Sequence, residues 1–356
     1  MNACGEQPSR PPGKPPKKGH VNRKRTTQSD VARLARVSQA TVSLVVNNSS
    51  LALPPETRSR VLEAIDELRY LPDSAARSLR TRRTMTIASV IPDITNPFYP
   101  AFERGIQQVA EANGYDHFVY STDGVRERER KSLRSLLQRG VDGAVVVLFH
   151  LSARELGELL EADLALVRLE PRRPKDSDSP IDNLYIDNEA AAHRATSYLL
   201  GRGHRRIALI GSKAGPGRER SLGYRRALSE AGVPVDERLV READFTLQGG
   251  VRAMQELLEI DPAPSAVFAQ NDLMAMGASQ VAKARGLRIP EDLAVVGFDD
   301  QPAAALVTPT LTTVTQFNEN LGARAAQMLF ERLSGGVVGP GRREEMPFEL
   351  VLRESA

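Results

Sequence analysis

Near the start of the chain, apolar residues recur at helical spacing. Residues 27–47 read TQSDVARLARVSQATVSLVVN. This period places small apolar side chains on one face of each of two short helices. The predicted faces consist of Val31, Ala32, Leu34 and Ala35 in the first helix, and of Val42, Val45 and Val46 in the second. Because these side chains are small, we expect the two helices to cross closely.

Capping residues mark the ends of these two helices. Thr27 is followed three positions later by Asp30, a capping-box pattern that satisfies the free backbone amides at a helix start. Ser38 can cap the second helix, and the chain turns near Arg36 and Val37. This arrangement predicts a helix-turn-helix, a motif whose second helix enters the major groove of DNA. An ordinary helical hairpin is the alternative.

The composition changes after a third helix, which is predicted over residues 55–68. The first 25 residues are rich in Pro, Lys and Arg and are expected to be disordered. The segment 73–80 is too short to form a stable helix by itself. The predicted divisions are a disordered basic tail at 1–25, an all-α helix-turn-helix headpiece at 26–72, a hinge and linker at 73–84, and a two-lobed domain at 85–356.

In the long remainder of the chain, short apolar runs alternate with helical patterns. One set of runs reads TIASVIP, YDHFVYS, DGAVVVLF, DLALVRL and NLYIDN, and a second reads RIALIG, LVREADF, SAVFAQ and DLAVVGF. Helices are predicted near 98–112, 126–139, 153–160, 191–200, 218–231, 250–258 and 273–284. Apolar strands between helices indicate parallel sheets covered on both faces. Two such sets predict an α/β domain of two lobes with a cleft, and the charged segment 170–180 is expected to be a loop between them.

The charge distribution separates the same two parts of the chain. Residues 1–84 contain 16 Lys and Arg against 7 Asp and Glu, a net charge of +9. The remaining residues contain 32 and 38, a net charge of −6. A basic N-terminal part on an acidic body indicates a polyanionic partner for that part alone. For the first 25 residues, a solvated basic tail is the alternative.

Several functional classes are not supported by the composition. The single cysteine, Cys4, excludes an intrachain disulfide and fits a reducing compartment. No apolar run is long enough for a signal peptide or a membrane span, so a cytoplasmic protein without a membrane partner is expected. The five histidines lack metal-ligand spacing, and neither a metal nor a cofactor is predicted. Asp299 and Asp300 are adjacent and would point in different directions, so we expect no enzyme.

Candidate binding residues lie just past the predicted strand ends, where ligands of open α/β sheets bind. The candidates are Asp93, Asn96, Phe98, Tyr99, Arg220, Phe245, Asn271, Asp299 and Gln316. Aromatic faces suit the C–H side of a sugar ring, whereas amides, carboxylates and a guanidinium bind hydroxyl groups. Each residue also has a structural alternative, since Asp299 could cap a turn and Phe98 could be core. A phosphate-bearing or purine ligand is the other possibility, because Lys213, Gly215 and Gly217 precede a helix start.

Three stretches together resemble one protein family. DVARLARVSQATVSLVVN, RYLPDSAARSLR and IPDITNPFY are similar, in this order, to sequences of the lactose-repressor (LacI/GalR) family of bacterial transcription regulators. The resemblance runs from about Thr26 to the C-terminus. It implies a periplasmic-binding-protein fold for the two lobes, with chain crossovers near residues 187, 315 and 345. Through the local motifs NPFY, RSLGY, ADF, QND, GFDD and TTVTQ, the resemblance also implies that every cleft candidate except Asp93 contacts the effector.

The resemblance also assigns the residues that would contact DNA. Gln39, Ala40 and Leu44 fall where base edges are usually read, although many relatives carry a polar or basic residue at the position of Leu44. Paired hinges would fold in the minor groove, with Leu79 as a wedge that opens the central base step. The full expected set is Thr27, Ser38, Gln39, Ala40, Thr41, Ser43, Leu44, Asn47, Ser74, Ala76, Arg77, Leu79 and Arg80. Arg36 departs from the glycine that relatives often have in the turn.

These observations predict a sequence-specific DNA-binding regulator of the repressor type. A small-molecule effector, with a sugar as the expected class, would bind between the lobes and control operator affinity. Two-fold symmetry predicts a homodimer on a near-palindromic operator, associated with the nucleoid in the cytoplasm. The alternative is a solute-binding receptor for a sugar transporter, against which the headpiece and the hinge argue. A sugar- or nucleoside-hydrolysing enzyme is a third reading, which turnover would reveal.

Overall fold

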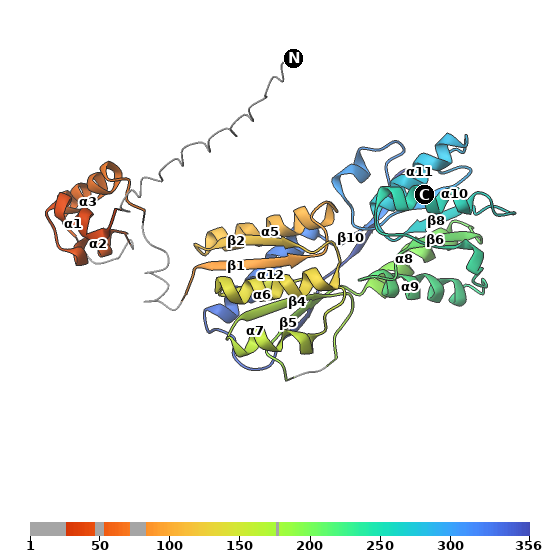
Figure 1. Cartoon of the computed structure of the whole chain (residues 1–356). Coiled ribbons are helices and arrows are strands. Elements are labelled where there is room, and N and C mark those ends of the chain that lie inside the picture. Colours follow the sequence, from red (N-terminus) through yellow and green to blue (C-terminus); the bar gives the residue numbers. More distant parts are fainter. Residues whose placement is uncertain (1–25, 47–52, 72–82, 176–177) are drawn as a thin grey trace, which may run out of the picture. The chain divides into compact units, whose positions relative to one another are not determined.

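The computed structural model describes residues 26–46, 53–71, 83–175 and 178–356. The chain forms two compact units, residues 1–76 and 77–356. The predicted basic tail lies outside the described residues, as does the predicted hinge except for its last two residues. The bounds of the helices and strands below are those labelled in Figure 1.

The first unit contains the three predicted helices. They are α1 (Gln28–Ala35), α2 (Gln39–Val46) and α3 (Pro55–Glu67). The capping box is present, because the Thr27 side chain accepts a hydrogen bond from the backbone of Asp30 and the Asp30 side chain accepts one from the backbone of Thr27. Arg36 ends α1 in the left-handed conformation (φ 54°, ψ 48°), with its N–H donating to carbonyls of the last turn. This confirms the predicted helix-turn-helix geometry.

The core of the first unit is built from small side chains. Its fully buried residues are Val31, Ala32, Ala35, Val42, Val45, Val61, Ala64 and Tyr70. The prediction that Leu34 faces this core is wrong, since Leu34 is 42% exposed. At 100° per residue, Val31, Ala32 and Ala35 share an arc of about 100°, and Leu34 falls about 60° outside it.

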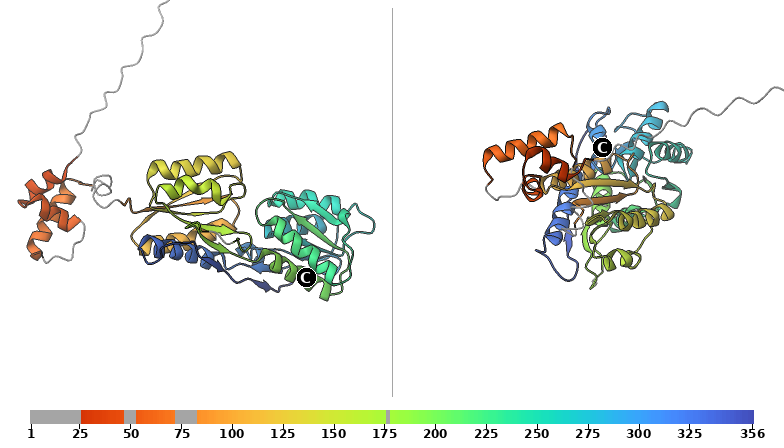
Figure 2. Two further views of the ribbon diagram at one scale, coloured as in Figure 1. Left: turned by 90° about the horizontal axis from the view of Figure 1, so that it is seen from below. Right: turned by 60° about the vertical axis from the view of Figure 1, so that its left-hand side comes forward.

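The first lobe of the second unit is built on a six-stranded parallel sheet in the order β11-β5-β4-β3-β1-β2. The strands are β1 (Thr86–Ile91), β2 (Asp116–Ser121), β3 (Gly143–Val146), β4 (Ala165–Glu170), β5 (Asp182–Tyr185) and β11 (Arg343–Glu345). The helices are α5 (Phe98–Ala112), α6 (Arg126–Arg139), η1 (Ala153–Leu156), α7 (Gly157–Glu161) and α12 (Asn318–Leu333). One apolar cluster joins α5 and α12 to one face of the sheet, and another joins α6 and α7 to the opposite face (Figure 2).

The second lobe repeats this arrangement around a four-stranded parallel sheet in the order β7-β6-β8-β9. The strands are β6 (Ile207–Gly211), β7 (Val240–Glu242), β8 (Ala266–Ala269) and β9 (Ala294–Val296). The helices are α8 (Asn188–Gly201), α9 (Gly217–Glu230), η2 (Glu237–Leu239), α10 (Leu247–Leu257), α11 (Asp272–Ala284) and η3 (Pro302–Ala305). The helices α8 and α9 cover one face and α10 and α11 the other, so the expectation of covered parallel sheets is confirmed.

The chain passes between the lobes three times. It leaves the first lobe between β5 and α8, returns between β10 (Thr313–Thr315) and α12, and leaves again between β11 and β12 (Glu349–Val351). A crossover strand was expected at LTTVT (311–315), where β10 lies, but its antiparallel pairing with β12 was not expected from the parallel pattern. The segment 170–180 was expected to connect the lobes, but it joins β4 to β5, two neighbours in one sheet.

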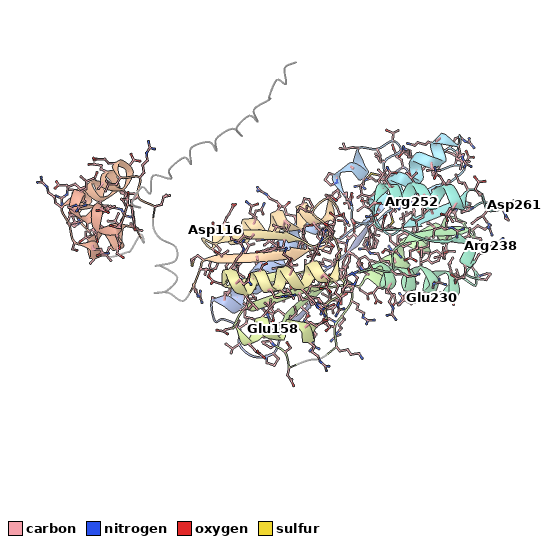
Figure 3. The ribbon with its side chains drawn as sticks, in the orientation of Figure 1. Asp116, Glu158, Glu230, Arg238, Arg252 and Asp261 are labelled. Atoms are coloured by element: carbon pink, nitrogen blue, oxygen red, sulfur yellow. The ribbon has the colours of Figure 1, made fainter. Side chains whose placement is uncertain are left out.

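The helix α12 is absent from the sequence prediction, although its position completes the first lobe. It packs against α5, and glycines on each helix allow the backbones to meet. A Cβ at Gly105 would lie 2.0 Å from the Glu319 carbonyl oxygen, and one at Gly322 would lie 1.8 Å from that of Phe102. Charged side chains such as those of Glu158, Glu230 and Arg252 project from the outer helical faces (Figure 3).

Candidate functional site

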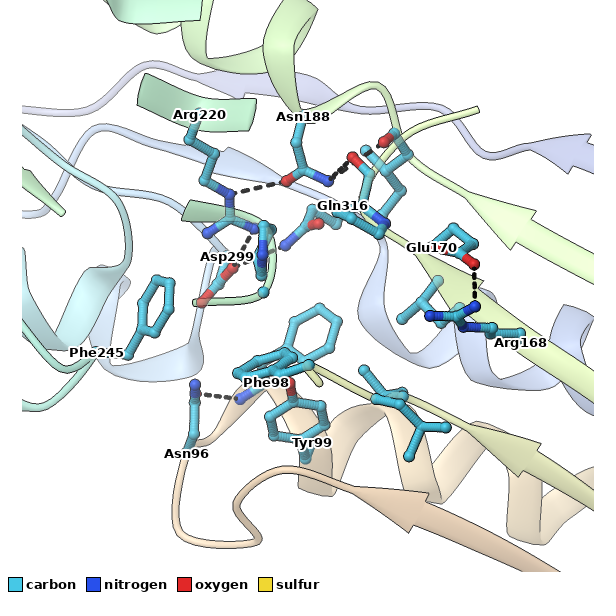
Figure 4. Close-up of a pocket in the computed structure, with 18 residues that line it drawn as sticks. Asn96, Phe98, Tyr99, Arg168, Glu170, Asn188, Arg220, Phe245, Asp299 and Gln316 are labelled. Atoms are coloured by element: carbon cyan, nitrogen blue, oxygen red, sulfur yellow. Dashed lines mark hydrogen bonds and ion pairs between the residues drawn. The ribbon is translucent and has the colours of Figure 1, made fainter. Parts of the chain in front are cut away.

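A cavity of about 190 Å³ lies between the two lobes of the second unit. Seven of the nine predicted cleft residues line it: Asn96, Phe98, Tyr99, Arg220, Phe245, Asp299 and Gln316. They come from strand ends and helix starts of both lobes, as the strand-end rule requires (Figure 4). By its position between the lobes, the cavity is the candidate small-molecule site.

Arg220, on α9, is the central charged residue of the second-lobe wall and is 4% exposed. Its Nε donates to the Asn188 side-chain oxygen at 2.8 Å, and its Nη1 donates to the Gln270 carbonyl oxygen. Its guanidinium carbon lies 3.6 Å from the centre of the Phe298 ring. Burial lowers the pKa of Arg220 to about 10, so the group stays charged at neutral pH. These neighbours hold the guanidinium on the sides that do not face the cavity.

Asp299 accompanies Arg220 on the same wall, with Oδ1 3.6 Å from the Arg220 Nη2. The Gln316 Nε2 donates to the same carboxyl oxygen at 2.7 Å. Burial raises the pKa of Asp299 to about 7, and the charge of Arg220 opposes this shift. Asp300 points elsewhere, since it accepts a hydrogen bond from Arg353 at 2.6 Å. Asp299 and Asp300 therefore do not form the pair of facing carboxylates that glycoside hydrolysis uses.

The first-lobe wall is aromatic. The rings of Phe98 and Tyr99, at the start of α5, meet edge to face with 5.0 Å between centres. Burial raises the pKa of the Tyr99 hydroxyl, which therefore stays neutral. The Asn96 side-chain oxygen accepts from the Phe98 backbone N–H at 3.2 Å and, across the cleft, from the Gln301 Nε2 at 3.4 Å. Phe98 thus belongs both to the hydrophobic core and to the cavity wall. The core role and the ligand-contacting role that were predicted as alternatives are therefore compatible.

Asp93 and Asn271, the other two predicted residues, do not line the cavity. The Asp93 carboxylate accepts from the backbone N–H and the hydroxyl of Thr95 at 2.8 and 2.7 Å, which closes a local turn. The Asn271 side chain is fully buried, caps α11 by accepting from the Met274 N–H, and donates to the Phe245 carbonyl oxygen at 2.8 Å. Asn271 therefore supports a lining residue without reaching the cavity itself.

Three polar lining residues were missed from the sequence. Arg168 and Glu170 lie at the end of β4 and form an ion pair at 2.9 Å. Asn188 links the lobes, because it accepts from Arg220 and donates to the Pro171 carbonyl oxygen at 2.9 Å. The strand-end rule would have found Arg168 and Glu170 if it had been applied to the run DLALVRL.

Gly215 and Gly217, which were considered for anion binding, lie where close packing leaves no room for a side chain. A Cβ at Gly215 would lie 2.4 Å from the Phe149 ring of the first lobe, and one at Gly217 would lie 2.0 Å from the Ser212 carbonyl oxygen. Lys213 forms an ion pair with Glu242 at 2.6 Å and is 84% exposed. Tight contact between the lobes therefore accounts for Gly215 better than a phosphate cradle does.

In the helical first unit, the predicted DNA-contacting residues of α2 are available at the surface. Gln39 and Ala40 are exposed, whereas Ser43 and Leu44 are half-buried. Ser38 caps α2, since its hydroxyl accepts from the Thr41 N–H at 3.1 Å. The predicted contacts Asn47, Ser74, Ala76, Arg77, Leu79 and Arg80 lie outside the described residues.

The described ranges of the chain offer neither a metal site nor a membrane-spanning helix. These ranges hold no group of three or more His, Cys, Asp or Glu side chains that could bind a metal ion. No helix within them has the length and apolar character needed to cross a membrane.

Comparison with known protein families matches both units. The model for bacterial regulatory proteins of the lacI family matches residues 27–73, and the periplasmic binding protein-like domain matches residues 196–356. The catabolite control protein A of Priestia megaterium is 35% identical over 329 residues, which cover 92% of this chain and 98% of that protein. Relatives of this kind are transcriptional regulators and not enzymes.

Two solved structures extend the comparison to the fold. A complex of the transcriptional regulator CelR with cellobiose has a TM-score of 0.70 at 35% identity, covering 93% of this chain and 100% of that one. The lac repressor dimer bound to operator and the anti-inducer ONPF has a TM-score of 0.80 at 26% identity, covering 93% and 99%. Because sequence and fold agree over nearly the whole length, this chain belongs to the LacI family of bacterial transcriptional regulators, with a DNA-binding headpiece and a periplasmic-binding-protein-like effector-binding domain.

Proposed function

We propose that this regulator is a repressor that binds a near-palindromic operator as a homodimer and responds to a sugar bound between its lobes. The cavity carries this proposal. Its one wall presents aromatic faces, and its other wall presents a buried guanidinium and carboxylate. Such a combination suits a ring with one apolar face and several hydroxyl groups.

The proposed sugar contacts divide between the walls. Phe98, Tyr99 and Phe245 would cover the C–H face of the ring, while Arg220 and Asp299 would bind neighbouring hydroxyl groups. Asn96 and Gln316 would add amide contacts, with Arg168 and Glu170 reaching a second part of the ligand. Asp93 and Asn271 are not included, since neither lines the cavity. The CelR structure contains cellobiose, which makes a β-linked glucose disaccharide the first ligand to test.

The proposed DNA contacts lie on α2 and its neighbours. Gln39 and Ala40 would read base edges with Leu44, while Thr27, Thr41 and Ser43 would bind phosphates, which orient the headpiece without specifying sequence. A homodimer is supported by the lac repressor, which is a dimer on its operator in the solved structure. The protein would act on nucleoid DNA in the cytoplasm and needs no cofactor for this role.

Thermal melting against a ligand panel tests the effector. Cellobiose, other sugars, sugar phosphates, nucleosides and purines would each be added to the purified full chain. A ligand at 100 times its dissociation constant adds about 2.7 kcal/mol, which moves the melting point visibly. A shift with a sugar supports the proposal, whereas a shift with purines alone would reassign the cavity.

Gel retardation tests the DNA partner and the coupling. The full chain should retard a near-palindromic duplex more strongly than a scrambled one, with an affinity that falls as salt rises. The ligand found by melting should change the operator affinity, typically by about 1–3 kcal/mol in coupling free energy. Equal binding to both duplexes would contradict sequence-specific recognition.

A further inference from the structure

Glu129 is a fully buried carboxylate on α6 that takes no part in the cavity wall. Its Oε1 accepts the Phe149 N–H at 2.8 Å, and its Oε2 accepts the N–H groups of His150 and Leu151 at 3.3 and 3.1 Å. Three successive backbone amides are thus fastened to one side chain. A buried charge needs such partners, because an unpaired one would be strongly destabilising.

The segment held by Glu129 is the part of the first lobe that meets the second lobe. Phe149 lines the cavity, and its ring packs on Gly215, where a Cβ would approach Cε1 to 2.4 Å. Arg126, also on α6, donates to the His150 carbonyl oxygen at 3.0 Å. The N-terminal half of α6 is therefore hydrogen-bonded to the segment of the first lobe that contacts the second lobe.

The C-terminal end of α6 is hydrogen-bonded to the residues that lie between the predicted hinge and β1. Gly140 ends the helix, and its carbonyl oxygen accepts from the Thr84 hydroxyl at 2.9 Å. Asp142, two residues further, accepts the Thr84 N–H at 2.8 Å and the Met85 N–H at 3.0 Å. The Thr84 hydroxyl also lies 3.0 Å from the Asp142 Oδ1.

A single helix thus connects the lobe contact to the base of the hinge. The fourteen residues of α6 span about 20 Å at 1.5 Å per residue, and the helix lies along the sheet of the first lobe (Figure 1). We infer that Glu129 and Asp142 are positioning residues, which make α6 a rigid relay between the cavity wall at Phe149 and the hinge base at Thr84 and Met85. This inference rests on the proposed control of DNA binding by an effector, and it names the parts of the first lobe that transmit it.

Hydrogen exchange in the full chain tests the relay without DNA or ligand. Glu129→Gln replaces one acceptor oxygen by an NH₂ group, so the three amides cannot all be held. The substitution should speed exchange at residues 149–151, where the bonds are lost, and also at Thr84 and Met85, on the order of tenfold. A purely local role for Glu129 would leave the exchange of Thr84 and Met85 unchanged, and that result would overturn the relay.

The reciprocal variant makes the test stricter. Asp142→Asn keeps only one acceptor oxygen, so it frees one of the Thr84 and Met85 amides, which bond different oxygens of Asp142. The relay requires faster exchange at residues 149–151 as well. The matched control is Glu127→Gln, on the same helix, because Glu127 is 73% exposed and forms only a 3.5 Å ion pair with Arg130. Glu127→Gln should leave hydrogen exchange unchanged at residues 149–151 and at Thr84 and Met85. Faster exchange throughout the lobe, including the central strand β4, would mean general destabilisation and would also overturn the relay.

A functional readout then separates this inference from the proposed function. Titrations of the full chain with cellobiose and operator duplex give the factor by which each changes the affinity of the other. In Glu129→Gln this factor should fall toward one, although the variant should still bind cellobiose alone and the operator duplex alone. A wild-type chain that ignores cellobiose and the rest of the panel would reject the proposed function. A coupled wild type whose Glu129→Gln variant stays equally coupled would reject the relay alone.

Discussion

The headpiece and the effector-binding domain bury different kinds of side chain. Among the described residues of the headpiece, every buried side chain is apolar, and most are Val or Ala. The effector-binding domain buries seven ionisable side chains at 7% exposure or less: Glu103, Glu129, Asp182, Glu219, Arg220, Asp272 and Asp299. The described residues of the headpiece keep their polar groups on the surface, where DNA could reach them. The larger domain keeps polar groups inside, where they surround a cavity and connect its parts.

This difference predicts that the largest single-residue effect lies in the effector-binding domain. Arg220→Ala would leave Asp299 buried without its cation and would break the links to Asn188 and Gln270. We expect a loss of about 3–5 kcal/mol in the free energy of unfolding, together with loss of ligand binding. Urea unfolding measures the first and ligand-dependent melting the second. Arg252→Ala is the matched control, because Arg252 is 62% exposed and should change stability by less than about 0.5 kcal/mol.

The stability of the effector-binding domain should also depend on pH through Asp299. Its folded pKa of about 7 exceeds the unfolded value of 3.8, so its protonation stabilises the folded protein. That contribution is fully present below about pH 4 and is lost as pH rises through about 7. Between pH 5 and pH 8 the loss is about 2–3 kcal/mol, and Asp299→Asn should remove it. Urea unfolding of both proteins at the two pH values measures this, with the exposed Asp116→Asn as control. Parallel pH profiles for all three proteins would contradict the assignment.

In the headpiece, by contrast, the stabilising polar groups are at helix ends, and smaller effects are expected. Thr27→Ala removes the side chain that accepts the Asp30 N–H at the start of α1. The headpiece should lose about 1 kcal/mol, which faster hydrogen exchange of the α1 amides in the full chain would report. Unchanged exchange would mean that Asp30 alone caps this helix.

The smallest predicted effect is a gain in stability. Arg36 is held at φ 54°, a region in which a side chain costs roughly 1 kcal/mol relative to glycine. Arg36→Gly should therefore stabilise the headpiece by up to about 1 kcal/mol and weaken non-specific DNA binding, because a surface cation is lost. Headpiece melting and salt-dependent gel retardation measure the two effects. A lower melting temperature would show that Arg36 stabilises the turn by contacts of its own.

The sequence predicted local features well and non-local ones less well. The bounds of α5 and α6 agree with the predicted helices, since an amphipathic period and a glycine at residue 140 define them locally. Asp93 and Asn271 were expected in the cleft because a capping side chain and a ligand-binding side chain occupy the same kind of position after a strand. Arg168 was missed because it sits inside what reads as an apolar strand, and Glu170 because it opens what reads as a charged loop. The placement of α12 depends on a crossover, which no local pattern specifies.

The three crossovers have a consequence for how the protein is made. The first lobe takes its edge strand β11 and its covering helix α12 from residues after 317, beyond the entire second sheet. During synthesis, residues 86–185 therefore emerge as a sheet that lacks one strand and much of one face. The second lobe has both faces of its sheet covered within its continuous segment, but it takes β12 from residues that follow β11. Domains usually fold in the order in which they leave the ribosome. Here neither lobe can finish until the C-terminal residues emerge, because β11 completes the first lobe and β12 the second, and a chaperone would meet the first lobe with the α5 face still open.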